Sequence, residues 1–195
     1  MLNRPAGRGK FGMGADDEAQ LVERIRARDL RAFEQLYKAQ HRRLSRFLSN
    51  MLRRPHLVEE VLNDTMMVVW DRIESFNGDS KLSSWMFGIA YRQGLSALRR
   101  NDDPIEDVRS EARPSTDPDP GELADAVQSR RALDLAIDAL SPAHRAVVNL
   151  TYFQELGYRE IAEIMECPVD TVKTRMFHAR RLLRHHLSGE LADWL

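Results

Sequence analysis

The feature that most constrains this chain is a pair of predicted helices around a short turn, at residues 158–187. Apolar residues in the first helix recur at three- and four-residue intervals, which places them on one helical face. They are Tyr158, Ile161, Ala162 and Met165. Pro168 cannot continue this helix, so we expect the helix to end near residues 166–167. Asp170 or Thr171 would cap the second helix, because a short side-chain oxygen can accept a free amide hydrogen of the first turn.

The second helix of the pair divides into an apolar face and a basic face. The apolar face is predicted to contact a core and comprises Val172, Met176, Ala179, Leu183 and Leu187. The other side carries Lys173, Thr174, Phe177, His178 and Arg181, with Arg180 and Arg184 beside them. Cations neutralise phosphates, while hydroxyl, imidazole and aromatic groups can contact base edges. This favours a helix-turn-helix whose second helix enters the major groove of DNA, although a solvated amphipathic helix has the same pattern.

The net charge of −1 is low for a nucleic-acid-binding protein, but the charge is unevenly distributed. Residues 101–128 contain nine acidic and two basic residues, a net charge of −7, so the rest of the chain carries +6. Residues 101–121 also contain four prolines, and we interpret them as an acidic flexible linker. A solvated spacer is the simplest role for such a segment.

Helical periodicity on both sides of this linker predicts an all-α fold of two small helical domains. In the first, residues 16–100, Asp16 or Asp17 would cap one helix and Asp29 the next. Pro55 interrupts the pattern before a third helix at residues 57–73, and a fourth is expected at about residues 82–100. The apolar stripe of the third helix comprises Leu57, Val58, Val61, Leu62, Met66, Val69, Trp70 and Ile73.

The second predicted domain spans residues 122–195, and residues 1–15 are predicted to be a disordered, glycine-rich tail. A helix at residues 122–140 would direct apolar side chains inward, namely Leu123, Val127, Leu133, Ile137 and Leu140. Ser141 would cap the following helix, and Pro142 suits its first position because the missing amide hydrogen is not needed there.

Composition excludes several classes of protein. Of 195 residues, 43% are hydrophobic and 30% charged, which is typical of a globular protein able to build cores. No apolar run is long enough to span a bilayer, and the N-terminus lacks the apolar core of an export signal. The single cysteine, Cys167, fits a reducing compartment, so we expect a cytoplasmic protein without membrane insertion.

No segment suggests catalysis. His185 and His186 lack partners at metal-ligand spacing, and there is no phosphate-cradling glycine loop or nucleophile–base signature. We therefore expect no catalytic residues, no metal and no cofactor, and a protein that is not an enzyme.

Four segments, taken in order, resemble the extracytoplasmic-function (group 4) bacterial sigma factors, and most of all their proteobacterial envelope-stress branch. VEEVLNDTMMVVW at residues 58–70 is similar to the helix that grips the polymerase clamp, and residues 76–100 to the promoter-melting segment. Residues 140–165 and CPVDTVKTRMFHARRLL at 167–183 resemble the helix-turn-helix of the fourth sigma domain. The resemblance covers roughly residues 20–187.

The resemblance implies a factor that binds core RNA polymerase, recognises and melts promoter DNA, and directs transcription initiation at a stress-type regulon. Polymerase would be bound by Glu59, Glu60, Asn63, Asp64 and Met67. The upstream "minus thirty-five" duplex would contact Arg159, Thr171, Lys173, Thr174, Arg175, Phe177, His178 and Arg181. The melted non-template strand at the start-proximal "minus ten" element would contact Phe76, Asn77, Gly78, Asp79, Ser80, Lys81, Arg92, Arg99 and Arg100. An anti-sigma factor is a further expected partner.

The chain departs from the usual family pattern at three points. Asn63 and Asp64 stand where the family usually has Gln and Glu, which shortens the polar stems on the polymerase-binding helix. Asp170 replaces a usual Gly and adds an anion near the start of the recognition helix, and His178 replaces a common Arg. Both changes affect the expected DNA preference.

Two other functions fit parts of the pattern. One is a helix-turn-helix regulator that acts on duplex DNA without polymerase, with the first hundred residues as a sensing domain. The other is a sigma mimic that titrates an anti-sigma factor. Such mimics tend to have a degraded DNA-binding face and an added receiver domain, whereas the basic faces here are intact.

Overall fold

The computed structural model describes residues 15–101 and 133–186, and every regular element in those ranges is a helix. The all-α prediction is confirmed. The elements are α1 (Ala15–Arg26), α2 (Leu30–Leu52), α3 (Pro55–Arg72), the 3-10 turn η1 (Ile73–Ser75), α4 (Leu82–Arg100), α6 (Pro142–Tyr152), α7 (Tyr158–Ile164) and α8 (Val169–His186). Residues 133–138 form a further helical segment before α6. The predicted tail at 1–15 lies outside the described residues except for residue 15. The predicted linker at 101–121 also lies outside them, except for residue 101.

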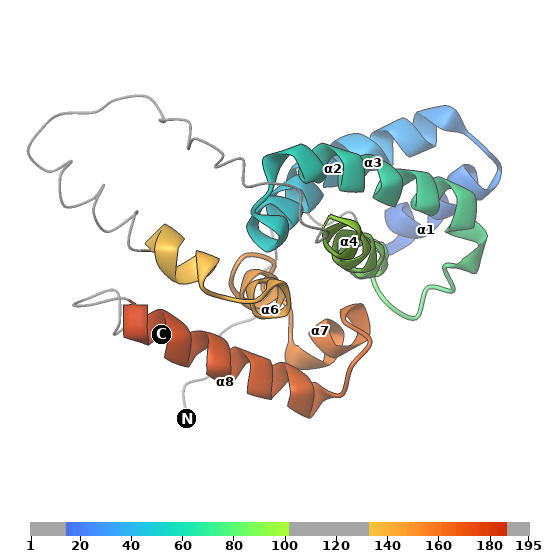
Figure 1. Cartoon of the computed structure of the whole chain (residues 1–195). Coiled ribbons are helices and arrows are strands. Elements are labelled where there is room, and N and C mark those ends of the chain that lie inside the picture. The colour runs from blue at the N-terminus through green and yellow to red at the C-terminus, as the bar shows by residue number, and fades with distance from the viewer. Residues whose placement is uncertain (1–14, 102–132, 187–195) are drawn as a thin grey trace, which may run out of the picture.

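The N-terminal group, α1 to α4, packs as two long antiparallel helices with α4 crossing beneath them (Figure 1). Asp29 caps α2 as predicted, with its carboxylate accepting from the amides of Arg31 at 2.9 Å and Ala32 at 3.2 Å. Arg53 ends α2 in a left-handed conformation, with φ of 55°, and Pro55 opens α3. Asp16 and Asp17 lie within the first turn of α1 and not before it, because that helix already begins at Ala15.

The C-terminal group consists of residues 133–138 and α6 to α8. Ser141 caps α6 as predicted, since its hydroxyl oxygen accepts from the His144 amide at 3.3 Å. Leu140 is buried beside Ala136, Ala179 and Leu183, but Leu133 is 38% exposed and so does not face inward. The helical period predicted a continuous inward stripe there, whereas this short segment packs only by its last residues. Leu123, Val127 and Leu187 lie outside the described residues.

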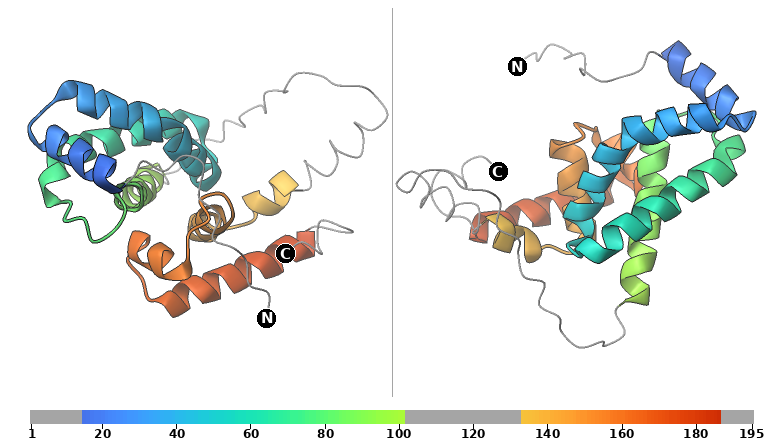
Figure 2. Two further views of the ribbon diagram at one scale, coloured as in Figure 1. Left: turned by 180° about the vertical axis from the view of Figure 1, so that it is seen from behind. Right: turned by 90° about the horizontal axis from the view of Figure 1, so that it is seen from above.

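The two groups pack against each other and share one apolar core. Buried residues of α2, α4, α6 and α8 belong to a single connected cluster, and α2 contacts α6 while α4 contacts α7. The two additional views in Figure 2 show the C-terminal helices lying directly against the N-terminal ones. The sequence predicted two domains on either side of a linker but not this contact between them.

Candidate nucleic-acid interface

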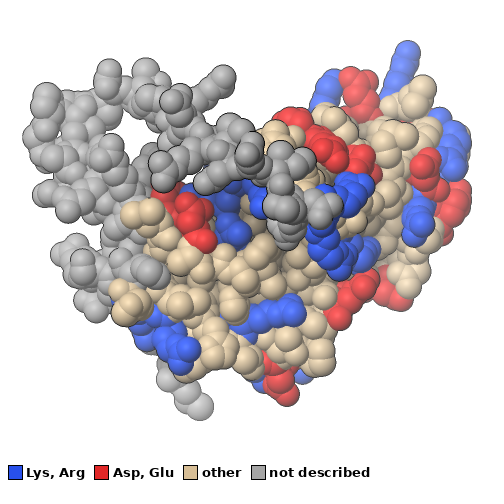
Figure 3. Space-filling view, viewed as in Figure 1, with Lys and Arg blue, Asp and Glu red and all other residues tan. Residues whose placement is uncertain are grey.

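Helix α8 separates a buried side from an exposed side, as its sequence predicted. Val172, Met176, Ala179 and Leu183 are at most 2% exposed, whereas the Phe177 ring is 62% exposed. Lys173, Thr174 and Arg181 are exposed and His178 is half-buried. Phe177, Arg180, Arg181 and Arg184 line a shallow surface groove, and cationic side chains gather over α8 on the face shown in Figure 3. This surface can offer cations to phosphates and an aromatic ring to bases.

The turn before α8 differs from the prediction. The first helix of the pair, α7, ends at Ile164, two residues earlier than expected. Helix α8 begins at Val169, so Asp170 and Thr171 lie within its first turn and do not cap it. The Pro168 carbonyl instead accepts from the amides of Thr171 at 2.9 Å and Val172 at 3.3 Å. Asp170 near the positive end of α8 remains electrostatically favourable.

Three residues of the predicted upstream set have polar partners within the protein, and one of them is Thr174, whose hydroxyl donates to the Asp170 carbonyl at 2.9 Å. Lys173 forms an ion pair of 2.9 Å with Asp170, one turn earlier on the same helix. Arg175 lies 3.7 Å from the Cys167 sulfur and close enough to Tyr91 of α4 to oppose the burial that raises the pKa of that tyrosine. Arg175 is therefore directed toward α4, away from the exposed surface of α8. The sequence did not predict this direction, because the hydrophobic period of one helix does not reveal a neighbouring helix.

The half-buried His178 ring has a histidine neighbour. His144 of α6 lies 6.4 Å away between ring centroids, and its Nδ1 is 2.9 Å from the Ser141 hydroxyl. Burial lowers the pKa of His144, and the nearby His178 and Arg175 lower it further.

The loop before α4 exposes polar groups to solvent and lies over a pair of packed aromatic side chains. Asn77, Gly78 and Asp79 are exposed, Asn77 accepts from the Asp79 amide at 3.2 Å, and its amide donates to the Asp79 carboxylate. Gly78 has φ of 81°, which glycine adopts without the strain of other residues. Phe76 is only 6% exposed and packs on Trp85 with ring centroids 5.4 Å apart. Phe76 is therefore largely buried beneath the loop, and its contact with DNA stays a prediction.

A polar groove that the sequence did not predict lies beside this loop, between α3 and α4. Its lining comprises Val68, Arg72, Ser75, Trp85, Ile89, Arg92 and Gln93. Only Arg92 was among the predicted residues. Arg72, Ser75 and Gln93 come from separate elements, so no local spacing in the sequence connects them. Cations beside an aromatic ring suit an unpaired nucleic-acid strand.

The remaining predicted strand contacts lie at the two ends of α4. Ser80 is half-buried and Lys81 is exposed just before the helix, while Arg99 and Arg100 are exposed in its last turn. Arg100 also approaches Glu60 of α3 at 3.4 Å. On the C-terminal group, Arg159 is exposed near the start of α7.

The predicted polymerase-binding residues share the outer side of α3. Glu59, Glu60 and Asn63 are exposed, Asp64 is half-buried and Met67 is 58% exposed. The opposite side of α3 is buried, including Val61 and Leu62 at 0%. An exposed methionine among acidic and amide side chains forms a surface suited to a protein partner.

Together, an all-helical fold, a helix-turn-helix with an exposed cationic helix, and a second polar groove define a DNA-facing helical protein. Residues 36–103 match the family described as Sigma-70 region 2, and residues 130–183 match Sigma-70, region 4. The chain belongs to the extracytoplasmic-function RNA polymerase sigma factors, which direct transcription initiation, and its relatives include proteobacterial members.

Individual relatives support this assignment along almost the whole chain. The "ECF RNA polymerase sigma factor RpoE" of Cereibacter sphaeroides is 30% identical, over 88% of this chain and 96% of its own. The "ECF RNA polymerase sigma-E factor" of Haemophilus influenzae is 28% identical, over 86% of this chain and 93% of its own. The sigma factor RpoE of Bartonella quintana, solved with the anti-sigma factor NepR, has the same fold, with a TM-score of 0.62, 24% identity, and coverage of 81% and 98%.

No helix within residues 15–101 and 133–186 combines the length and the apolar character that crossing a membrane requires.

Proposed function

We propose that this sigma factor binds its partners through three surfaces on two domains. The N-terminal domain binds core RNA polymerase through the outer side of α3 and holds the melted non-template strand with the loop at 76–81 and α4. The C-terminal domain binds the upstream duplex through α8. The segment between the two domains is a linker at about residues 101–121, and the chain acts in the cytoplasm as a binding protein without enzymatic chemistry.

The single observation that carries this proposal is the separation of exposed functional side chains from the buried ones. Phe177 is 62% exposed on α8 and Met67 is 58% exposed on α3, although the other large apolar residues of both helices are buried or half-buried. Isolated exposed apolar residues are common, but these two lie among cationic and anionic side chains respectively. Such mixed surfaces match the chemistry of nucleic-acid and protein partners.

An anti-sigma factor is part of the proposal. Two solved relatives form complexes with another protein, the Bartonella quintana sigma factor with the anti-sigma factor NepR and CnrH with the cytosolic domain of CnrY. A partner that covers both the α3 and α8 surfaces would block polymerase and DNA together. Co-purification from native cells under non-inducing conditions would recover this inhibitor, and its absence would contradict this part.

The decisive experiment is run-off transcription with purified core polymerase over a promoter library. The full chain should support specific initiation only when core polymerase is present. Promoter-specific duplex binding by the chain alone, without any effect on polymerase, would instead identify a conventional helix-turn-helix regulator.

The polymerase-binding surface is tested by reversing a charge on α3. Asp64→Lys should weaken polymerase binding at least about tenfold, because a like charge at a protein interface costs several kcal/mol. Glu34→Lys is the matched control, since Glu34 is exposed on α2 and pairs only locally with Lys38 at 2.5 Å. Equal losses in the two variants would show that net charge, and not the α3 surface, governs binding.

A further inference from the structure

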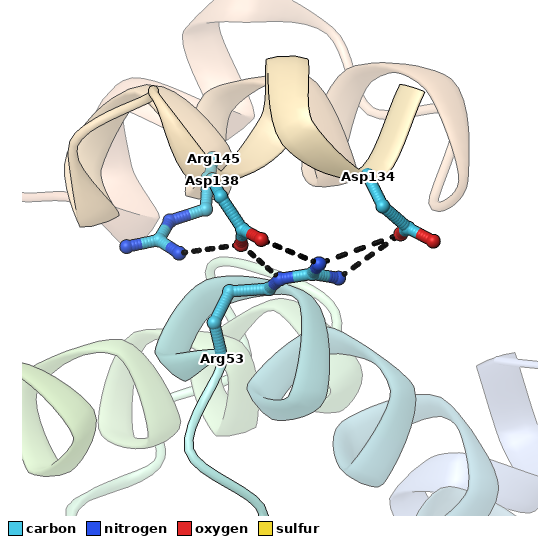
Figure 4. Close-up of polar contacts among 4 residues, drawn as sticks. All are labelled: Arg53, Asp134, Asp138 and Arg145. Carbon is cyan, nitrogen blue, oxygen red and sulfur yellow. Dashed lines mark hydrogen bonds and ion pairs between the residues drawn. The ribbon is translucent and has the colours of Figure 1, made fainter. Parts of the chain in front are cut away.

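Long-range polar contacts serve different parts of this structure. Arg53 of α2 lies between two carboxylates of the C-terminal group, Asp134 and Asp138, and so joins the two helical groups (Figure 4). Two other contacts stay within the N-terminal group. They connect α1 to the two ends of the loop at residues 76–81, across 50 and 64 positions of the chain.

Arg26, the last residue of α1, holds the start of this loop. One terminal nitrogen of its guanidinium donates to the Phe76 carbonyl at 2.5 Å, and the other donates to Glu23 of α1 at 2.6 Å. Its Nε lies 3.9 Å from a carboxylate oxygen of Glu74. The Arg26 side chain is 29% exposed and Phe76 is buried, so this contact is largely shielded from solvent.

Glu18, about two turns earlier on α1, holds the other end of the loop. Its carboxylate accepts from the Leu82 amide, the first amide of α4, at 2.8 Å. Lys81, which precedes α4, makes no capping hydrogen bond with its side chain, and the first turn of α4 contains no acidic residue. Glu18 therefore supplies, from another helix, a cap that the sequence around α4 lacks. A carboxylate there also complements the positive end of the α4 dipole.

The spacing of these two residues lets one helix reach both ends of the loop. Glu18, Val22 and Arg26 follow one another at four-residue intervals, so they lie along one side of α1. Val22 is 4% exposed and belongs to the core, which fixes this side of α1 against the rest of the group. At 1.5 Å per residue, Glu18 and Arg26 are about 12 Å apart along the helix axis. Two contacts at that separation on a packed helix restrict the movement of both loop ends.

The residues between these two contacts are exposed and have few restraints of their own. Asn77, Gly78 and Asp79 are all exposed, and Gly78 has a positive φ of 81°. Ordering such a segment only when a strand binds would cost conformational entropy. A loop whose ends are already fixed loses less entropy on binding and keeps its polar groups in one arrangement.

We propose that α1 positions the strand-binding loop, with Glu18 and Arg26 as positioning residues that fix its two ends. The inference rests on the proposed role of the loop in binding the melted strand, and goes beyond that role by assigning α1 a function in strand affinity. Neither residue contacts the strand. Both act through the backbone of residues 76 and 82, and the loop binds an unpaired strand more tightly because its ends are held.

The first test removes the cap. Holoenzyme assembled from the full chain and core polymerase is titrated with a short fluorescent single-stranded DNA, which carries the start-proximal sequence of a promoter selected by run-off transcription. Glu18→Ala should weaken strand binding about three- to tenfold, because fewer molecules hold the loop in its binding conformation. The sign is diagnostic, since losing an anion should by itself strengthen binding to a polyanion. Asp17→Ala is the matched control, because Asp17 is exposed in the same turn of α1, and it should not weaken binding.

The second test removes the contact at the start of the loop. Arg26→Met should also weaken strand binding about three- to tenfold, for the same reason. Arg31→Met is its control, since Arg31 is an exposed cation of α2 and its loss changes the net charge equally. Glu18→Gln should keep most of the affinity, because its carboxamide oxygen can still accept from the Leu82 amide. Equal losses in Glu18→Gln and Glu18→Ala would overturn the role assigned to that hydrogen bond.

Two measurements separate positioning from a general loss of structure. Amide hydrogen exchange at residues 77–82 should be faster in Glu18→Ala and Arg26→Met, while the buried parts of α2 and α6 keep their protection. Binding of the upstream duplex through α8 should change by less than about twofold, because distant sites act independently. A loss of duplex binding in parallel with strand binding would indicate unfolding and overturn the inference.

The loop variant Asn77→Ala distinguishes failure of this inference from failure of the proposed function. If Asn77→Ala weakens strand binding and the two α1 variants do not, α1 does not position the loop, and the strand-binding role of the loop stands. If none of the three variants weakens strand binding, both the inference and the proposed role of the loop are wrong. Losses in Asp17→Ala and Arg31→Met equal to those in the α1 variants would reduce the effect to net charge and overturn the inference.

Discussion

The two regions of this sigma factor that we propose to contact DNA are built in opposite ways. On α8, Phe177 and its cationic neighbours are exposed along one helix, and their buried counterparts lie on the other side of the same helix. On the N-terminal group, the corresponding surface is assembled from η1, the loop, α3 and α4, and Arg92 is already paired with a carboxylate of the other group. A surface on one helix can be predicted from its period, whereas a surface assembled from several elements depends on how they pack.

The largest expected effect tests the two sides of α8 with neighbouring residues. Met176→Ala should lower the free energy of unfolding by about 2–4 kcal/mol, because Met176 is 1% exposed and truncation leaves a cavity. Phe177→Ala should change it by less than about 0.5 kcal/mol, since the ring is mostly in solvent. Urea denaturation followed by circular dichroism measures both. Comparable losses would mean that Phe177 also packs in the folded protein.

The next effect separates duplex recognition from strand capture. Replacing Thr174 or Phe177 with Ala should change the preferred upstream sequence, at about 1–3 kcal/mol for each lost base contact. Replacing Asn77 or Asp79 should leave duplex binding unchanged and impair opening of the start-proximal element. Duplex affinity and the reactivity of unpaired thymines in the open complex are measured on one promoter. A loop variant that lost duplex affinity yet opened normally would reverse the assignment of the two regions.

A smaller effect concerns the ion pair at the start of α8. Asp170 holds Lys173 at 2.9 Å and so competes with any phosphate for that cation. Asp170→Asn should strengthen duplex binding a few-fold at low salt, and Lys173→Ala should reduce the slope of log affinity against log salt by about one. Arg181→Ala provides the comparison, because Arg181 is exposed on the same helix. A weakened duplex affinity in the Asn variant would show instead that Asp170 orients Lys173 for binding.

The smallest effect is a pH dependence confined to the C-terminal group. The pKa of His144 is lowered in the folded protein, so the unfolded chain binds a proton more readily. Stability should therefore be fully present above about pH 6.5 and fall as pH drops from there toward the folded pKa. Thermal melts of the parent and His144→Gln between pH 7.5 and 5.5 measure this, and the variant should lose part of the slope. Identical slopes would exclude His144 as the titrating group.

Much of the fold was predictable because it depends on short-range rules. The Asp29 cap, the break at Pro55 and the bounds of α4 followed from capping oxygens, proline and helical period. The predicted start of α8 was wrong, because more than one residue near the turn could begin the helix. Asp170 is a good capping residue, but the Pro168 carbonyl accepts from the Thr171 and Val172 amides, and α8 starts two residues earlier than an Asp170 cap would require.

A candidate site was more predictable from the sequence when its residues lie close together in the chain. For α8, the period identified the exposed set but not the direction of Arg175, which depends on Tyr91 of a distant helix. For the N-terminal group, the sequence did not reveal that Phe76 is buried under the loop or that Arg72, Ser75 and Gln93 line a groove. A loop phenylalanine is exposed or buried according to whether a partner such as Trp85 is within reach, and that is not encoded in local spacing.

The sequence by itself determined the helices, their buried sides and the family, because hydrophobic period, caps and motif order are properties of neighbouring residues. Only the tertiary structure decided that the two helical groups share a core and that Arg53 and Arg92 meet carboxylates 74 to 85 positions away in the chain. The physical reason is that a charge pattern specifies which groups can attract one another. Which of them meet depends on the packing of apolar faces, and here that packing brings α7 against α4.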